Sequence, residues 1–211
     1  INYSKGVSIV GIDETQFLGY DQLNAEGKVL GLWNDDLQVD SATSGKDYIL
    51  ALDQSPFYAE SGGQVGDQGE FSGSNGSGQV TDCIKQGKIF LHKINLEEGS
   101  IKLNDTLKLS VAPSMRSDAA SNHSATHLMH AALKHVLGNH VEQKGSLVDS
   151  SKLRFDFSHP KAVTKDELKQ IELLVNQQTL SNAEVKTELM QLDDAIASGA
   201  NPTDKPQIII T

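Results

Sequence analysis

The chain has 211 residues, of which 37% are hydrophobic, so it is long enough to bury one large core or two small ones. Its formal net charge of −10 argues against a broad positive surface for nucleic acid, so we expect any RNA contact to be local or to be delivered by a neighbouring domain, and we expect no binding to DNA. No apolar run approaches the roughly 20 residues of a membrane span, so we expect no membrane contact and a cytoplasmic location. The lone cysteine, Cys83, allows no internal disulfide.

Residues 1–112 are expected to form a small β-barrel. Four short apolar segments are separated there by clusters of Gly, Asn, Asp and Ser, which is typical of barrel strands and their turns. These expected strands are residues 7–12, 47–52, 87–92 and 106–111. The polar run 72–78 predicts a hairpin tip or a mobile loop, and Asn24 with Gly27 predicts another turn.

Residues 113–211 change character, and we expect a two-layer α+β domain there. Helix-forming and apolar residues predict a helix over 119–137, which Gly138 and Asn139 should end. Residues 141–148 and 151–157 predict an antiparallel hairpin. The fold class is therefore α+β, with an N-terminal barrel followed by this layer.

A capping box at Thr164 predicts a second helix through about residue 181. Its expected apolar stripe consists of Leu168, Ile171, Leu174 and Val175. A strand near Val185 and a short helix over 192–197 complete the expected elements.

His123 and His127 lie four residues apart at the start of the expected helix. Side chains at this spacing leave the same face, and two imidazoles so placed can share a tetrahedral zinc ion. The alternative is that both histidines only cap or flank the helix, and spacing alone does not decide between these. A zincin protease is disfavoured, because no Glu directly follows His123 to act as general base. We expect His130, His135 and His140 to be ordinary surface or partly buried side chains.

Three stretches of the sequence carry a family resemblance when they are taken together. They are residues 53–69, which contain Ser-Gly-Gly-Gln-Val-Gly-Asp, residues 122–128, which read Asn-His-Ser-Ala-Thr-His-Leu, and residues 140–148 followed by 153–157. In this order they resemble the editing region of alanyl-tRNA synthetase and its free-standing editing relatives, and the resemblance extends to about residue 200. It implies hydrolysis of the ester that joins serine or glycine to the alanine tRNA.

The resemblance also implies a cofactor and partners. Zinc would be held by His123 and His127, together with a later Cys and His that this sequence lacks. The partners would be the acceptor end of tRNA(Ala) and the remainder of a synthetase, including an ATP-binding adenylating domain. Such a second site is needed because a pocket for alanine cannot strongly reject serine or glycine. Whether zinc would activate a water or only position the substrate stays open.

The ligand pair that the family places after its editing core, within Cys-Gly-Gly-Thr-His, has no match here. Residues 201–211 do not resemble what the family has next, and Cys83 lies in the barrel half and matches no family ligand. The chain also starts at Ile1 rather than Met. We therefore expect a fragment or processed product whose editing domain is incomplete at its C-terminal end.

Five further residues are candidates for the site. Gln143 has an amide able to bond substrate or water, against the alternative of an ordinary strand residue. The Thr126 hydroxyl either recognises a serine side chain or bonds back to its own helix. Gly62, Gly63 and Gln64 belong to the glycine-rich stretch, which the resemblance links to serine discrimination. Its glycines would let bare backbone approach a substrate, although such glycines more often make a turn or bulge.

The sequence is compatible with three functions from different classes. The first is a deacylating editing domain, whose activity in this chain would be impaired. The second is a tRNA-presenting barrel with a catalytically silent site. The third is an unrelated metal-binding module that shares only the histidine pair. Zinc content and deacylation of mischarged tRNA separate the three.

Overall fold

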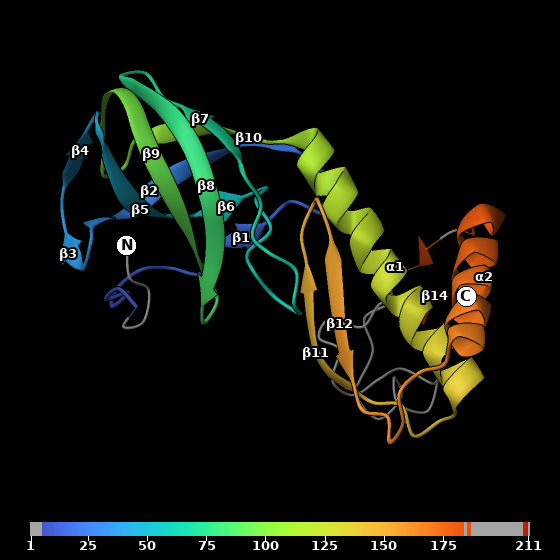
Figure 1. Ribbon diagram of the computed structural model, residues 1–211. Helices are drawn as coiled ribbons and strands as arrows, with labels where there is room; N and C mark the ends of the chain where they lie inside the picture. The colour runs from blue at the N-terminus through green and yellow to red at the C-terminus, as the bar shows by residue number, and fades with distance from the viewer. Residues whose placement is uncertain (1–5, 184, 187–208, 211) are drawn as a thin grey trace. The chain divides into compact units, whose positions relative to one another are not determined.

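The computed structural model describes residues 6–183, 185–186 and 209–210 (Figure 1). The chain forms two compact units. The first comprises residues 1–61 and 65–117, and the second comprises residues 62–64 and 118–211. The short segment 62–64 of the glycine-rich stretch therefore groups with the second unit, although the sequence around it belongs to the first.

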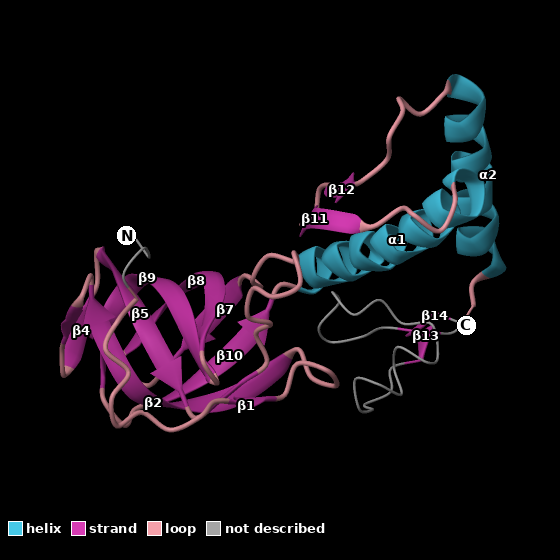
Figure 2. Cartoon of the chain, turned by 90° about the horizontal axis from the view of Figure 1, so that it is seen from below, coloured by secondary structure: helices cyan, strands magenta, loops and turns pink. Residues whose placement is uncertain are grey.

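The first unit is a β-barrel. Six antiparallel strands of the described chain follow the order β10-β7-β8-β9-β5-β2, and β10 also pairs with β2, which closes the sheet (Figure 2). β3 extends the sheet beside β2, β4 pairs with β9, and β1 pairs with β6 in parallel. The strands are β1 Gln16–Phe17, β2 Asn24–Asn34, β3 Leu37–Gln38, β4 Ser41–Thr43, β5 Lys46–Leu52, β6 Gln54–Ser55, β7 Gly69–Ser72, β8 Gly76–Gln86, β9 Ile89–Lys102 and β10 Thr106–Val111.

Strand β5 explains how the barrel is filled and covered. Its residues from Tyr48 to Leu52 are all buried, because opposite faces of the strand meet two different apolar clusters. Leu50 and Leu52 belong to the large cluster of the barrel. Ile49 belongs to a second cluster with Trp33 and Val7. Residues near the N-terminus thus cover one face of the sheet.

Two sequence expectations about the barrel are wrong. Residues 7–12 form no strand, because Gly6 and Gly11 take positive φ angles of 64° and 80° and turn the backbone at both ends. Asn24 and Gly27 form no turn but lie within β2, where a Cβ on Gly27 would come 2.6 Å from the carbonyl oxygen of Gln54. The glycine at position 27 therefore allows the backbone of Gln54 to come close to β2. The expected strands 47–52 and 106–111 and the hairpin at 72–78 are confirmed.

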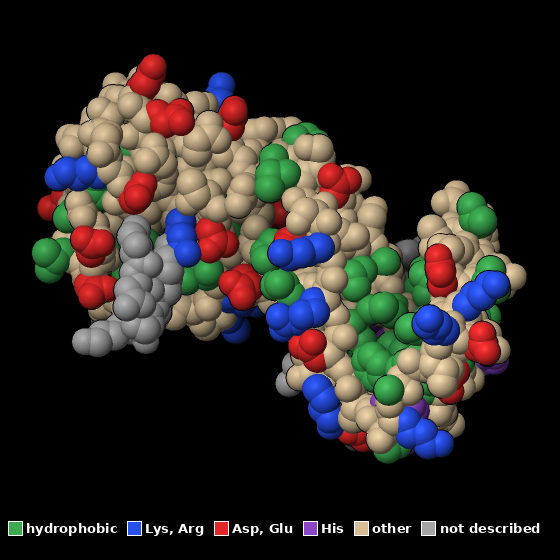
Figure 3. Space-filling view, in the orientation of Figure 1, with side chains coloured by type: hydrophobic (Ala, Val, Ile, Leu, Met, Phe, Trp, Pro, Cys, Tyr) green, Lys and Arg blue, Asp and Glu red, His purple; other side chains and the backbone are tan. Residues whose placement is uncertain are grey.

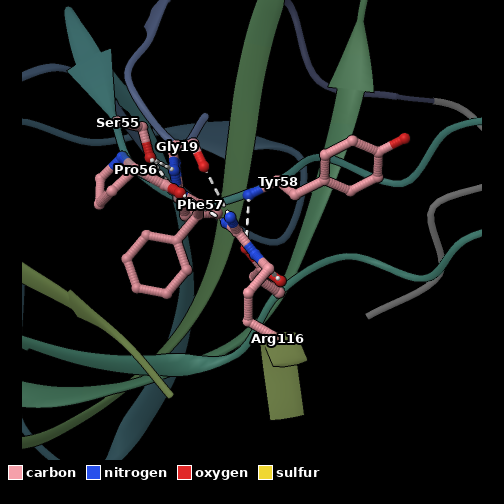
Figure 4. Close-up of polar contacts among 8 residues, drawn as sticks. Gly19, Ser55, Pro56, Phe57, Tyr58 and Arg116 are labelled. Carbon is pink, nitrogen blue, oxygen red and sulfur yellow. Dashed lines mark hydrogen bonds and ion pairs between the residues drawn. The ribbon is translucent and has the colours of Figure 1, made fainter. Parts of the chain in front are cut away.

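Helix α1, Pro113–Leu137, begins six residues before the expected start, with Pro113 in the first turn, where proline is favoured. Arg116 attaches this turn to the barrel (Figure 4). Its guanidinium forms an ion pair with Asp67 and donates to the carbonyl oxygens of Gly19, at 2.7 Å, and Pro56, at 2.9 Å. Asp67 also accepts from the backbone N–H of Tyr58 at 2.8 Å. The guanidinium of Arg116 and the carboxylate of Asp67 thus both have their partners within the first unit.

The second unit packs two helices with a β-hairpin. The hairpin strands β11, Gln143–Val148, and β12, Leu153–Phe157, are antiparallel as expected, and α1 ends before Gly138, whose φ is 116°. Helix α2, Lys165–Ser181, starts at the expected capping box on Thr164. The core cluster consists of Ala132, Leu133, Val141 and Ile171, with partly buried neighbours that include Phe155, Phe157, Leu174 and Val175.

Leu168 departs from the expected stripe of α2, since 53% of it is exposed. It lies one turn before Ile171, near the start of the helix, where the core ends. Strand β13, Val185–Lys186, pairs with β14, Ile209–Ile210, and the first of these matches the strand expected near Val185. The helix expected over 192–197 lies outside the described residues. The α+β class with an N-terminal barrel is confirmed.

In the part of the chain that the structure describes, no helix is both long and apolar enough to cross a membrane.

Candidate functional site

The two histidines predicted as metal ligands share one face of α1. The rings of His123 and His127 are stacked, with their centroids 5.1 Å apart and their planes 14° from parallel. This is the arrangement that four-residue spacing gives on a helix, where side chains one turn apart are neighbours. The alternative in which the histidines cap the helix is wrong, because α1 begins at Pro113 and both residues lie well inside it.

The segment 62–64 lies against β11. Gln64 forms a parallel bridge with Val148, and the backbone N–H of Val148 donates to the carbonyl oxygen of Gly63 at 2.7 Å. The approach is so close that a Cβ on Gly63 would lie 2.7 Å from the carbonyl oxygen of Ser146. Gly63 also has a φ of 83°, which L side chains rarely adopt. Both the contact and the conformation therefore require glycine at position 63.

Gln64 joins this segment to the histidine pair. Its Oε1 lies 2.7 Å from Nδ1 of His123, across a sequence separation of 59 residues. The side chain is only 6% exposed. The glycine-rich stretch and the His-x-x-x-His helix, which the sequence could relate only by family resemblance, are thus in direct contact within the second unit.

Gln143 and Ser146 occupy the same strand, beside segment 62–64. The amide Nε2 of Gln143 donates to Oγ of Ser146 at 3.2 Å, and that hydroxyl lies 3.4 Å from the carbonyl oxygen of Gly62. Gln143 is partly exposed, so its amide oxygen can still accept a hydrogen bond from a ligand. The sequence reasoning missed Ser146, because a serine on a strand carries no signal of the backbone that packs on it.

Thr126 is buried in α1, and its hydroxyl donates to the carbonyl oxygen of Asn122 at 2.9 Å. The hydroxyl thus bonds back to its own helix, which is one of the two roles that the sequence left open for Thr126. A hydroxyl that donates in this way can still accept, so recognition of a substrate hydroxyl remains a proposal.

Two imidazoles on one helix face could supply two of the four ligands that tetrahedral zinc takes, and their donor chemistry suits that ion. Within residues 6–183, 185–186 and 209–210, no three His, Cys, Asp or Glu side chains gather as a metal site would require. Cys83 is fully buried in β8 and does not belong to such a group. The pair therefore fits half of a zinc shell.

The other histidines of this unit have separate surroundings. His130 is buried with its ring 5.1 Å from that of Phe155, and His135 is exposed. His140 Nε2 lies 2.8 Å from Nδ1 of His159 on the surface. The expectation that these three are ordinary surface or partly buried side chains stays a prediction.

The family model described as tRNA synthetases class II (A) matches residues 5–115, which is more than half of the chain. The chain belongs to this family. Similar curated proteins are alanine–tRNA ligases. That of Rhizobium meliloti is 50% identical over 187 residues, which make up 88% of this chain and 21% of the relative. That of Nitrosomonas eutropha is 47% identical over 196 residues, which make up 92% of this chain and 23% of the relative.

The matched region extends well past the family model. The alanine–tRNA ligase of Parvibaculum lavamentivorans aligns over 191 residues at 49% identity, which is 90% of this chain. The chain spans about a fifth of the length of these relatives. The resemblance to alanyl-tRNA synthetase is confirmed, and it excludes an unrelated metal-binding module that shares only the histidine pair.

Proposed function

We propose that the chain is the editing part of an alanine–tRNA ligase and that it hydrolyses the ester of seryl- or glycyl-tRNA(Ala) at a zinc site on His123 and His127. The observation that carries this proposal is the 2.7 Å contact between Gln64 and His123. It gathers a potential substrate-binding backbone and a potential metal-binding pair into one place. The similarity to alanine–tRNA ligases supports tRNA(Ala) as the nucleic-acid part of the substrate.

The backbone at Gly62 and Gly63 suits the amino acid end of the substrate. The Cβ direction of Gly63 is filled by Ser146, whereas Gly62 is exposed, so a small amino acid could approach the backbone at Gly62 without meeting a Cβ. The hydroxyl of Ser146 lies beside this backbone and accepts from the amide of Gln143, and Thr126 carries a second hydroxyl in the same unit. Polar groups that pair with a substrate hydroxyl separate serine from alanine far better than an apolar wall does.

The chain's own residues would divide the work as follows. His123 and His127 would hold the ion, Gln143 would orient the water or the ester by hydrogen bonding, and the backbone of segment 62–64 would seat the amino acid. When bound, zinc supplies Lewis acidity toward a water or a carbonyl oxygen. Two further positions of the ion would be filled by ligands that the family resemblance places on a Cys and a His.

The charge distribution bears on where tRNA binds. Residues 6–117 carry eight Lys and Arg against sixteen Asp and Glu, whereas residues 118–183 carry seven of each. Acidic side chains are spread over the visible face of the barrel in Figure 3. Because a polyanion is repelled by an acidic surface, we place the RNA contact on the second unit and disfavour a barrel that presents tRNA.

The test uses tRNA(Ala) charged with labelled serine. The chain extended by the family's Cys-and-His segment should release serine, while the chain as given should be feeble, because half of the metal shell is missing. In the extended protein, His123→Ala should abolish zinc binding and release, and Gln143→Ala should slow release with little loss of fold. His135→Ala is the matched control on the same helix and should change neither.

Equal release by the chain as given and by the extended protein would show that the added ligands are not essential. An extended protein that binds zinc and the tRNA but never releases serine would instead favour a silent tRNA-binding fragment. Metal content should be measured on each sample, so that these two results are not confused with loss of the ion.

A further inference from the structure

Gln64 is held more firmly than a residue of an exposed glycine-rich loop would be. Its backbone forms the bridge with Val148, and the preceding carbonyl of Gly63 accepts the 2.7 Å bond from the Val148 N–H. Gln64 is also buried, with only 6% of the residue exposed. A side chain whose backbone is fixed by a strand and whose amide is buried keeps one orientation.

The contact that this orientation makes has a chemical direction. With the Gln64 amide oriented as in the structure, Oε1 faces the ring, and because an amide oxygen only accepts hydrogen bonds, the 2.7 Å contact corresponds to a proton on Nδ1 of His123. A neutral imidazole carries one proton, and Nε2 then keeps its lone pair. Free imidazoles in water populate both tautomers, so this contact selects one of them.

We propose that Gln64 is a positioning residue that fixes the tautomer and the ring orientation of His123, and so presents Nε2 of that ring to a metal ion. This goes beyond a substrate-binding role for the glycine-rich stretch. The part of this proposal that concerns metal binding rests on the proposed function, whereas the part that concerns the tautomer of His123 does not. The partner ring of His127, stacked at 5.1 Å, gains from the same constraint, because one member of the pair is already in place.

A hydrogen-bonding partner on the far nitrogen is the usual way in which proteins prepare a ligating histidine. It fixes the ring and raises the basicity of the ligating nitrogen, and its loss typically costs about 10- to 100-fold in metal affinity. The neutral amide of Gln64 does this without adding a negative charge beside a site that we propose for a polyanionic substrate. A carboxylate at this position would hold the same tautomer and add that charge.

The test reads the tautomer directly in the metal-free chain. Long-range ¹H–¹⁵N correlation spectra of histidine-labelled protein, recorded at a pH where the rings are neutral, distinguish Nδ1–H from Nε2–H at each ring. We expect His123 to be almost wholly Nδ1–H and exposed His135 to show the mixture of a free ring. Gln64→Ala should move His123 toward the His135 pattern, and Gln64→Glu should keep it Nδ1–H.

Ser146→Ala is the matched control, because it removes the neighbouring contacts to Gln143 and Gly62 but leaves the Gln64 amide in place. It should leave the His123 tautomer unchanged. Circular dichroism at 222 nm should show that each variant keeps its helices. Gln64→Glu keeps a hydrogen-bond acceptor at this position, whereas Gln64→Ala does not. If Gln64→Glu keeps the Nδ1–H tautomer and Gln64→Ala loses it, the acceptor itself is needed and filling the space is not enough.

Zinc titration of the same proteins gives the second readout. Gln64→Ala should weaken zinc binding about 10- to 100-fold, while Gln64→Glu and Ser146→Ala should stay near the parent affinity. The proposal is overturned if His123 of the parent chain is a mixture or is Nε2–H, or if Gln64→Ala leaves both tautomer and affinity unchanged. If the parent chain shows the expected tautomer but binds no zinc, the result counts against the proposed function alone. The tautomer of His123 is measured in metal-free protein and does not depend on zinc.

Discussion

Ser55 and His92 share a hydrogen bond of 2.7 Å between Oγ and Nε2 in the interior of the barrel, where neither side chain is exposed. The other ring nitrogen of His92 lies 3.3 Å from the carbonyl oxygen of Leu50, and the N–H of Phe57 donates to Ser55 Oγ at 3.1 Å. A serine and a histidine in contact suggest a nucleophile with its base. Full burial denies them a substrate, so we assign the pair to the stability of the barrel.

Acid should destabilise the barrel through His92. Burial lowers the pKa of His92 from 6.5 to about 4, so between these pH values the unfolded chain binds a proton that the folded chain does not. Stability is therefore full above pH 6.5 and falls as the pH drops toward 4. From pH 7 to pH 5 the loss from this group should be about 2 kcal/mol. Urea unfolding followed by fluorescence of Trp33, the only tryptophan, measures it in the barrel.

The matched variant is His92→Gln, which keeps a polar side chain but does not titrate. It should be less stable at pH 7, yet its stability should change about 2 kcal/mol less between pH 7 and pH 5. Parallel pH profiles for parent and variant would contradict the assignment.

Gly63→Ala should destabilise the second unit more than an ordinary glycine substitution. The new Cβ would lie 2.7 Å from the carbonyl oxygen of Ser146, at a φ of 83°. Gly45 is the matched control, because its φ of 86° is equally unfavourable but nothing lies within 4 Å of its added Cβ. Gly45→Ala should cost about 1 to 2 kcal/mol, and Gly63→Ala roughly 1 to 3 kcal/mol more. Urea unfolding measures both, with circular dichroism for the second unit and Trp33 fluorescence for the barrel.

Arg116→Met should destabilise the first unit by about 3 to 5 kcal/mol, because it leaves the carboxylate of Asp67 buried without its ion pair. Asp67 has only 5% of its side chain exposed, and Arg116 17%. The exposed pair of Arg154 and Asp156 is the control, and Arg154→Met should cost under about 1 kcal/mol. If the two substitutions cost the same by urea unfolding, the buried cluster of Figure 4 is not a main support of the barrel.

Thr164→Ala should weaken α2 by about 1 kcal/mol, because it removes the hydroxyl that accepts from the N–H of Glu167 in the capping box. Thr164→Ser should retain most of that stability. Thr179→Ala, near the end of the same helix, removes only a hydroxyl that bonds back to Val175, and should cost less. Circular dichroism during urea unfolding ranks the three, and an equal loss for both alanine variants would refute the capping role.

Local patterns were enough to predict the elements whose partners are close in sequence. The capping box of Thr164, the glycine that ends α1 and the β11–β12 hairpin all depend on contacts within a few residues, and the structure has each of them. The side-by-side rings of His123 and His127 follow in the same way, because helix geometry alone puts residues four apart on one face.

The sequence misled where a residue's role depends on a distant partner. Asn24 and Gly27 have turn composition, yet they lie in a strand because β10 and the backbone of Gln54 pack against them. Residues 7–12 are apolar like a short strand, yet positive φ angles at Gly6 and Gly11 turn their backbone, and their apolar side chains cover one face of the sheet. Leu168 fits a helical stripe, but the core stops short of it.

By itself, then, the sequence determined the α+β class, the helix that carries the histidine pair and the family to which the chain belongs. Only the tertiary structure decided that Gln64 contacts His123 and that Ser146 packs on Gly63. The physical reason is that hydrophobic periodicity and capping are local properties, whereas a hydrogen bond across 59 residues depends on how β11 and segment 62–64 come together in the folded chain.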